Sequence, residues 1–249
     1  MAYGSAVALR VRPSGESNRE AWFLTGEDGI LRATVFGGPK SRLRAQVSPF
    51  HSGKLLIYHD PVRDSRKVED FDVSSYRPGL RERYERAITA GAIAETILST
   101  HGSGGDWPEA VKLTAGALDA IESAGGGAHC TRVGVYFLWR WALLLGVQPD
   151  LGSCASCARE ASRDKPLWYF TDRESLFCEA CCGINASEAA SGIRIGPGAR
   201  LWLGEIAQIP PSALARISLD ASSLEQAKAL STAVLAATLG RRLATWDGI

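Results

Sequence analysis

The first third of the chain alternates between hydrophobic and polar residues over short runs that turn residues separate. Alternation with a period of two is typical of strands that bury one face. We predict five strands: Ala6–Arg12, Glu20–Thr25, Ile30–Phe36, Lys54–Tyr58 and Lys67–Val73. Five short strands in succession favour a small barrel, and five is the strand number of an OB-fold.

The pattern changes to a helical period after Pro78. We predict helices over Glu82–Ser99, Pro108–Ser123, Arg132–Val147 and Ser222–Leu239, with a short one around Arg200–Ala207. The helix over Pro108–Ser123 should begin near Asp106, and Ser222 or Ser223 should cap the helix over Ser222–Leu239. The third is apolar nearly all round, which is typical of the buried centre of a bundle. The fold class is therefore α+β, with a β-barrel domain over residues 1–78 and a helical domain over residues 79–249.

Four cysteines form two pairs with a Cys-x-x-Cys spacing, Cys154 with Cys157 and Cys178 with Cys181, and twenty residues separate the pairs. This spacing is typical of a structural zinc site, in which four thiolates surround one Zn²⁺. We expect a zinc module at about residues 150–185, inserted in the helical domain. The alternatives are redox dithiols or thiols without metal. Cys182 is a possible substitute for Cys181, but the spacing favours Cys181.

A catalytic zinc site normally includes histidine and leaves one position open for water. The four histidines lie far from the cysteines along the chain, and the His-x-Glu and Pro-Cys-x-x-Cys signatures of zinc deaminases are absent. The motifs Gly-x-x-x-x-Gly-Lys-Ser/Thr, Gly-x-Ser-x-Gly and His-Glu-x-x-His are absent as well. We therefore interpret the metal as structural and expect a protein that is not an enzyme.

The overall composition is that of an ordinary globular protein, with 45% hydrophobic residues, 22% charged residues and a net charge of +1 over 249 residues. Six cysteines without a secretory signal at the start favour a reducing compartment. No apolar run approaches the ~20 residues of a membrane span. We expect a cytoplasmic protein with no membrane partner.

Positive charge is concentrated in the barrel region. Residues 40–67 hold seven basic and two acidic side chains, and further arginines lie on the earlier strands. A cationic face on a small barrel favours contact with a phosphate backbone; the alternative is an ordinary solvated face. Aromatic residues such as Trp22 and Tyr58 either stack on bases or fill the core. The candidate nucleic-acid contacts are Arg10, Arg12, Arg32, Lys40, Arg42, Arg44, Lys54, Arg66 and Lys67.

The order of these features resembles the RecO family of bacterial recombination mediators. The resemblance rests on the opening run Ala8–Ser17, on Gly29–Ala33, on Gly37 to Leu43, and on the passage from Leu144 through Leu151 into Cys154. It covers nearly the whole chain. Three features depart from the family pattern. The loop at 37–39 carries fewer basic residues than is usual, which argues for weaker DNA binding. Ala158 stands where a glycine often follows the first cysteine pair, and Arg173–Ser175 replaces a glycine-rich turn.

The resemblance implies an N-terminal OB-fold, a helical C-terminal domain and an embedded zinc finger. It implies binding of single- and double-stranded DNA, annealing of complementary strands, and work with RecR and single-stranded-DNA-binding protein to help load RecA at gaps, near the bacterial nucleoid. Lys40, Arg42 and Arg44 match the family's basic DNA-contacting loop, and Arg140 is the candidate partner contact. The competing hypotheses are a non-catalytic interaction scaffold with weak DNA binding and a zinc enzyme that acts on nucleic acid.

Overall fold

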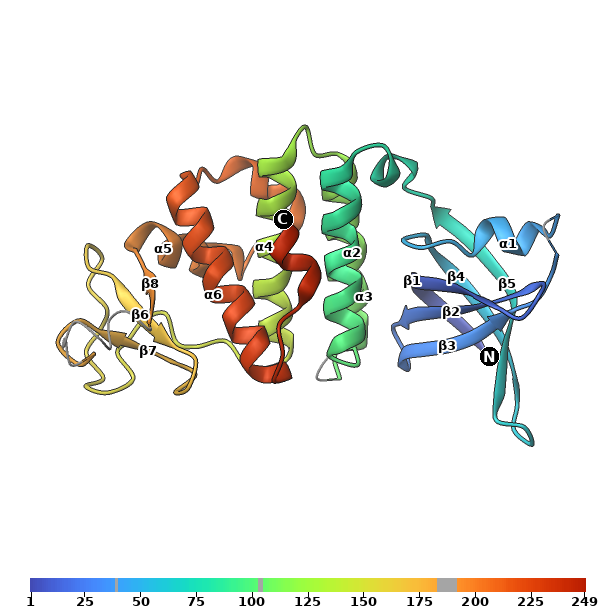
Figure 1. The fold of residues 1–249 in the computed structure, drawn as a ribbon, viewed down its shortest axis with the longest axis horizontal. Helices are drawn as coiled ribbons and strands as arrows, with labels where there is room; N and C mark the ends of the chain where they lie inside the picture. Colours follow the sequence, from blue (N-terminus) through green and yellow to red (C-terminus); the bar gives the residue numbers. More distant parts are fainter. Residues whose placement is uncertain (39, 103–104, 183–191) are drawn as a thin grey trace. The chain divides into compact units, whose positions relative to one another are not determined.

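The computed structural model describes residues 1–38, 40–102, 105–182 and 192–249, and Figure 1 shows its elements. The chain divides into two compact units, Met1–Cys130 and Thr131–Ile249. The first unit combines a β-barrel with two long helices. The second combines helices with a small three-stranded sheet.

Five strands of the first unit form a closed barrel, as the sequence predicts: β1 (Ala2–Ser14), β2 (Asn18–Thr25), β3 (Gly29–Val35), β4 (Ser52–Asp60) and β5 (Ser65–Ser75). The order around the barrel is β1-β2-β3-β5-β4. All neighbours are antiparallel except β3 and β5, which run parallel.

The alternation of side chains places one face of each strand inside the barrel. Phe23 and Phe71 meet there in an edge-to-face pair with ring centroids 5.5 Å apart. A short helix that the sequence did not predict, α1 (Arg42–Gln46), follows β3. Val47 at its end is buried in the barrel core, and Leu43 packs against that core. These two contacts hold α1 against the barrel.

The helices of the first unit are η1 (Pro78–Arg81), α2 (Tyr84–Ser99) and α3 (Trp107–Glu122). Asp106 caps α3 as predicted, because its side chain accepts a hydrogen bond from the Glu109 amide at 3.2 Å. Trp107 at the start of α3 lies against Gly29, where an added Cβ would come within 3.0 Å of the indole. Gly29 also has a φ of +67°. Glycine therefore suits this position for two reasons, the close approach of the indole and the left-handed backbone.

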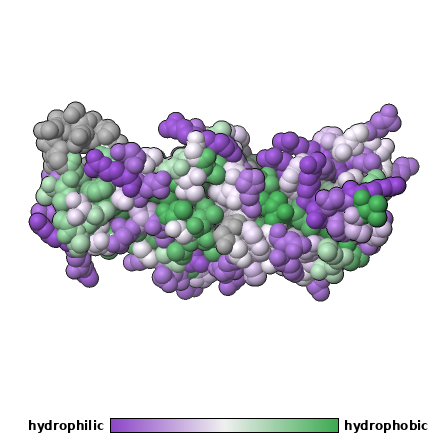
Figure 2. Space-filling view, turned by 90° about the horizontal axis from the view of Figure 1, so that it is seen from below, coloured by the Kyte–Doolittle hydropathy of each residue, from purple (hydrophilic) through white to green (hydrophobic). Residues whose placement is uncertain are grey.

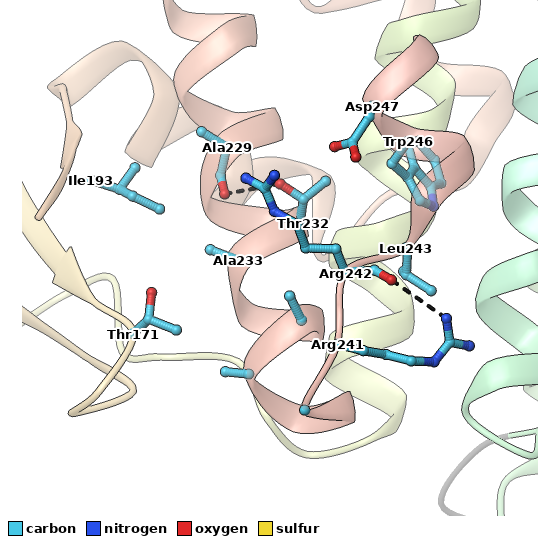
Figure 3. Close-up of a pocket in the computed structure, with 13 residues that line it drawn as sticks. Thr171, Ile193, Ala229, Thr232, Ala233, Arg241, Arg242, Leu243, Trp246 and Asp247 are labelled. Carbon is cyan, nitrogen blue, oxygen red and sulfur yellow. Dashed lines mark hydrogen bonds between the residues drawn. The ribbon is translucent and has the colours of Figure 1, made fainter. Parts of the chain in front are cut away.

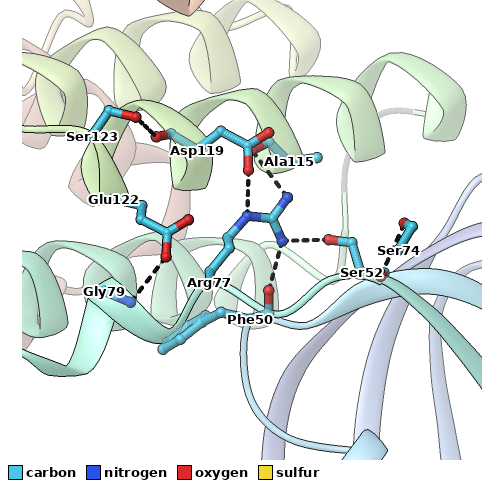
Figure 4. A network of polar contacts seen from close by, with 9 residues as sticks. All are labelled: Phe50, Ser52, Ser74, Arg77, Gly79, Ala115, Asp119, Glu122 and Ser123. Carbon is cyan, nitrogen blue, oxygen red and sulfur yellow. Dashed lines mark hydrogen bonds and ion pairs between the residues drawn. The ribbon is translucent and has the colours of Figure 1, made fainter.

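A buried guanidinium connects the barrel to α3 (Figure 4). Arg77 is only 3% exposed. It donates to the Phe50 carbonyl at 2.7 Å and the Ser52 hydroxyl at 2.6 Å, both from the barrel side, and to the Asp119 carboxylate of α3 at 2.6 Å. Nearby, the Gly79 amide donates to Glu122 of α3 at 2.9 Å. The segment between barrel and helices is thus fixed by polar contacts on both sides.

The second unit contains most of α4 (Gly127–Leu144), with α5 (Pro197–Ile206), η2 (Pro211–Arg216), α6 (Ala221–Leu239) and η3 (Ala244–Gly248). The α4 helix ends earlier than predicted. Gly146 adopts a left-handed φ of +71°, and the Val147 amide donates back to Ala142 at 3.0 Å. This is a Schellman ending, which satisfies the last carbonyls of the helix before Val147.

The start of α6 also differs from the prediction. Asp220, not Ser222 or Ser223, is the cap, and its carboxylate accepts from the Ser223 amide at 2.9 Å. A carboxylate at this position also interacts favourably with the positive end of the helix dipole. The hydrogen bonds lower the Asp220 pKa, the largest effect coming from Ser223.

The small sheet has the order β7-β6-β8, with β6 (Leu167–Phe170), β7 (Ser175–Cys178) and β8 (Ile193–Ile195). On the face seen in Figure 2, hydrophilic residues are interspersed with patches of hydrophobic ones. Within the described ranges, no helix has both the length and the apolar character that a bilayer crossing requires.

We predict that Arg77→Met lowers the free energy of unfolding by about 3 kcal/mol, because it leaves the Phe50 carbonyl and the Ser52 hydroxyl without their donor. Thermal unfolding followed by circular dichroism should show a fall in Tm of roughly 6–12 °C. The same change at Arg63, an exposed residue of the β4–β5 turn, is the control and should leave Tm within about 2 °C. Equal Tm values for the two variants would contradict the role of Arg77.

Candidate nucleic-acid interface and metal site

The small sheet of the second unit positions the two cysteine pairs. Cys178 ends β7 and pairs in register with Leu167 of β6. The first pair is held by backbone bonds, since the Cys154 amide donates to Arg159 at 3.0 Å and the Ala155 amide donates to Leu176 of β7 at 2.9 Å. A turn closes the second pair, in which the Cys181 amide donates to the Cys178 carbonyl at 2.9 Å. The backbone therefore brings both pairs to one place.

The sulfur atoms of Cys154, Cys157, Cys178 and Cys181 all lie within 4.8 Å of one another. Cys157 Sγ and Cys178 Sγ are 3.9 Å apart. In a tetrahedron with Zn–S bonds of about 2.3 Å, adjacent sulfurs would be roughly 3.8 Å apart. The donor set and its spacing therefore fit a tetrahedral thiophilic metal ion.

The pKa values of two of these thiols, Cys154 and Cys181, are strongly shifted. Burial opposes ionisation of Cys154, but hydrogen bonds from the backbone at Cys157, Cys178 and Ser156 outweigh it and lower the pKa to about 6. The Cys178 amide, for example, lies 3.3 Å from Cys154 Sγ. Hydrogen bonds to Cys157 and Cys178 raise the pKa of Cys181 to about 12. Four thiols this close cannot all ionise without a cation between them, which is what a divalent metal supplies.

Cys182 lies outside this cluster. It is 4% exposed, and its thiol donates to the Phe177 carbonyl at 3.7 Å. Phe170 and Phe177 form an apolar group with Cys154 and Cys182, and their rings meet edge to face at 5.8 Å. The geometry thus favours Cys181 over Cys182 as the fourth sulfur.

The two departures in the cysteine module, at Ala158 and at Arg173–Ser175, include residues with a strained backbone. Ala158 has a φ of +55° and Glu174 a φ of +48°, both in the left-handed region that favours glycine. The Ala158 amide donates a hydrogen bond to the Cys154 carbonyl at 2.9 Å, which closes the turn that carries Cys154 and Cys157. The turn therefore forms without glycine. The substitution changes the strain in the module and leaves the four sulfurs together.

On the barrel, three strands combine cations with one aromatic ring. Trp22 of β2 is opposite Arg10 of β1 and Arg32 of β3. The guanidinium carbons of Arg12 and Arg32 lie 5.7 Å and 5.5 Å from the Trp22 ring centroid, within the range of cation–π attraction. Arg32 also forms an ion pair with Glu20.

A second group lies on β4 and β5. Lys67 Nζ is 4.5 Å from the centroid of Tyr58, whose side chain is 47% exposed. A hollow of about 250 Å³ lies beside these strands and is lined by Glu20, Arg32, Ala33, Thr34, Asp64, Ser65 and Arg66. Arg32, Arg66 and Lys67 thus lie on the adjoining strands β3 and β5, and Arg12 of β1 meets Arg32 at the Trp22 ring.

Two other predicted contacts have acidic neighbours. Lys54 is opposite Asp72 of β5, next to a pair formed by Leu56 and Asp70. Arg10 faces Glu95 of α2: burial lowers the Arg10 pKa, the Arg12 charge lowers it further, and Glu95 raises it. Nearby carboxylates weaken attraction for phosphate at both positions.

The predicted basic loop is partly described: Lys40 precedes α1, Arg42 and Arg44 belong to it, and Pro39 lies outside the described residues. Lys40 and Arg42 are exposed, and Arg44 is half-buried. Arg19, which the sequence did not single out, donates to the backbone carbonyls of Arg44 and Val47. This contact fixes the end of α1 and holds the loop against the barrel.

Arg140, the candidate partner contact, is used inside the second unit. Arg132, Tyr136 and Arg140 lie four residues apart along one face of α4 and donate to backbone carbonyls between Ala207 and Leu219. Arg140 itself donates to Ala207, the residue that ends α5. This contact gives Arg140 a structural role, and the partner contact stays a prediction.

A cavity of about 490 Å³ lies between α6, η3 and the sheet of the second unit (Figure 3). Small side chains of α6 such as Ala229 and Ala233 line it, together with Arg241, Arg242 and Trp246. The sequence did not reveal this cavity, because no short motif marks residues that meet from separate elements.

Comparisons with known proteins cover both units. The family models described as "Recombination protein O N terminal" and "Recombination protein O C terminal" match residues 1–76 and 81–247. A protein named DNA repair protein RecO from Desulfitobacterium hafniense is 26% identical over 252 residues, which cover 98% of this chain and 88% of the relative. Proteins of the same name from Desulforudis audaxviator and Bifidobacterium longum subsp. infantis are 29% and 28% identical, over 71% and 70% of this chain and 68% and 71% of their own lengths.

A closed OB-like barrel joined to a helical unit with four clustered cysteines defines the class of protein. Both halves of that architecture match one family, and the order of elements agrees with the resemblance seen in the sequence. The chain belongs to the RecO family of DNA repair proteins.

We predict that Ala158→Gly stabilises the second unit by about 0.5–1 kcal/mol, since glycine removes the left-handed strain at some cost in chain entropy. The matched control is Ala155→Gly, at a neighbouring exposed residue without a positive φ, which should be neutral or destabilising. Thermal unfolding of the two purified variants measures the difference. A lower Tm for Ala158→Gly than for Ala155→Gly would contradict the strain argument.

Proposed function

We propose that this protein is a non-enzymatic recombination mediator that binds single- and double-stranded DNA and anneals complementary strands. It acts at gaps coated by single-stranded-DNA-binding protein and helps load RecA together with RecR, in the cytoplasm at the nucleoid. In this proposal residues 1–78 form the DNA-binding domain and residues 79–249 the helical domain that carries the zinc finger.

The observation that supports DNA binding most is the row of cations on adjoining barrel strands. Arg12, Arg32 and Lys67 lie on one face of their strands, Arg66 lines the hollow beside Arg32, and the exposed Lys40 and Arg42 add charge beside α1. Cations spaced along a surface neutralise phosphates and release condensed counterions, which is the main source of affinity that does not depend on base sequence. Annealing needs this kind of grip, because it must hold any pair of complementary strands.

The four clustered thiols support a structural Zn²⁺ held by Cys154, Cys157, Cys178 and Cys181. Four protein ligands fill a tetrahedral shell and leave no position for a substrate, so the ion would supply folding energy to the module. The ion would hold the turn of Cys154 and Cys157 and the turn of Cys178 and Cys181 beside β6 and β7. The Cys178 amide orients the Cys154 sulfur.

The partners RecR and single-stranded-DNA-binding protein are proposed from membership of the family alone. The alternative, a scaffold with weak DNA binding, has one observation in its favour: the acidic neighbours of Lys54 and Arg10 narrow the cationic surface. Removing positive charge from the barrel distinguishes the two hypotheses, because only the mediator should then lose DNA binding and annealing.

We predict that the triple variant Lys40→Ala, Arg42→Ala, Arg44→Ala binds a single-stranded oligonucleotide at least about tenfold more weakly at low salt. Its plot of log K against log salt concentration should lose roughly 2 units of slope, because each phosphate contact with a single strand contributes about 0.7. Fluorescence anisotropy at several salt concentrations measures both quantities. The control is Lys112→Ala, Arg163→Ala, Lys165→Ala, which removes the same charge from exposed residues outside the barrel.

The same variants serve in an annealing assay on strands coated with single-stranded-DNA-binding protein, with and without RecR. The barrel variant should anneal more slowly and the control variant should match the wild type. Unchanged annealing by the barrel variant would favour the scaffold instead.

We predict that protein purified without chelators contains about one zinc ion per chain. Cys154→Ser combined with Cys157→Ser should remove the zinc and lower thermal stability, because two ligands of the shell are lost. Cys182→Ser is the matched control: its thiol lies outside the cluster, so this variant should keep the metal. Elemental analysis that finds no zinc in the wild type, or zinc in the double variant, would refute the assignment.

A further inference from the structure

The aromatic residues of the cationic barrel surface carry information that its charge alone does not. We infer that Trp22 and Tyr58 are base-stacking platforms that make this surface selective for single-stranded over duplex DNA, with Arg12, Arg32, Arg66 and Lys67 holding the phosphates between and beside them. This inference rests on the proposed DNA binding and names the residues that set its specificity.

Trp22 is an unusual residue to find on the outside of a barrel strand. It is only partly buried, while its neighbours Ala21 and Phe23 point into the core and are fully buried. Its indole is the shared partner of two guanidinium groups, those of Arg12 and Arg32. Among the described residues Arg12 forms no ion pair, Arg32 pairs with Glu20, and Glu95 of α2 acts on Arg10 opposite Trp22. An anion beside the indole would complete the arrangement.

The strand registers connect Trp22 to Tyr58 across the barrel. Trp22 is opposite Arg32, and two residues further along β3 Thr34 is opposite both Glu20 of β2 and Lys67 of β5. Lys67 is in turn opposite Tyr58 of β4 and lies over its ring. Residues two apart on a strand share a face, so the two aromatics and the cations between them line one outer surface. The platforms are three strand spacings and two residues apart, or about 16 Å along the sheet.

The hollow between the platforms has the chemistry of a phosphate site. Arg32 and Arg66 both line it, together with the hydroxyl residues Thr34 and Ser65. The hollow also contains two carboxylates: Glu20 pairs with Arg32, and Asp64 lies 3.2 Å from His59. Arg66 forms no ion pair among the described residues, so its guanidinium is available to an incoming phosphate.

The combination favours single strands for a steric reason. The bases of a duplex are stacked on each other and paired, so their faces are not accessible to Trp22 or Tyr58. A single strand offers every base as a flat face, and stacking on an aromatic side chain stabilises the complex whichever base is present. Duplex DNA would use the cations alone.

The test measures binding of labelled oligo(dT) and of a duplex of equal length to full-length protein by anisotropy. Trp22→Ala and Tyr58→Ala should each weaken oligo(dT) binding about tenfold and duplex binding less than about twofold. Neither should change the salt slope for oligo(dT), because stacking removes no ion contact, whereas Lys67→Ala should reduce it by roughly 0.7. The control is Tyr84→Ala, a 70% exposed tyrosine of α2 away from this surface, which should change neither affinity.

Duplex binding also reports that each variant is folded. If Trp22→Ala loses both ligands, the variant Trp22→Phe distinguishes lost stacking from lost folding. It should bind oligo(dT) within about threefold of the wild type, because phenylalanine keeps an aromatic face. It should also lose the quenching of Trp22 fluorescence by oligo(dT), Trp22 being the only tryptophan among residues 1–75. Loss of both ligands by Trp22→Phe, or unchanged oligo(dT) affinity in both alanine variants, would overturn the inference and leave the proposed function standing. A wild type that binds neither DNA would overturn both.

Discussion

The buried guanidinium of Arg77 is the contact on which the first unit depends. It joins a barrel carbonyl and hydroxyl to a carboxylate of α3, and its own backbone has a left-handed φ of +47°. A non-glycine residue keeps such a conformation only where its surroundings over-determine it. Here they do, because several hydrogen bonds converge on one side chain and the Gly79 amide is held by Glu122. The chain therefore leaves the barrel in one direction, and α3 can cover β1 and β2.

The small sheet of the second unit needs a different source of stability. Three strands of only three or four residues have too little apolar surface to be stable alone. Phe170 and Phe177 pack with Cys154 and Cys182, and a metal ion bound to the four clustered sulfurs would add ligand bonds to this packing. A metal ion bound to these four sulfurs would concentrate the stability of the module in ligand bonds, and such a module could tolerate strained turns at Ala158 and Glu174.

Much of this architecture could be predicted from the sequence. Alternation identified all five barrel strands, the cysteine spacing identified the four sulfurs, and Asp106 marked the start of α3. Other features were not accessible. Bulges at Ala8/Arg10 and Leu56/Ile57 shift the register, so the sequence could not tell that Arg10 would lie opposite Trp22 or that Lys54 would lie opposite Asp72. The roles of Arg77, Arg19 and Arg132 depend on carbonyls distant in sequence, and α1 is too short for a periodic signal.

The barrel closes at one weak seam. β3 and β5 share a single registered pair, Thr34 with Lys67, whereas β4 and β5 pair along nearly their whole length. A nucleic-acid strand lying over Arg32 and Lys67 would bridge the two edges of this seam. Closure and occupancy would then be thermodynamically linked, so that the ligand adds RT ln(1 + [L]/Kd) to the closed form and opening of the seam releases the ligand.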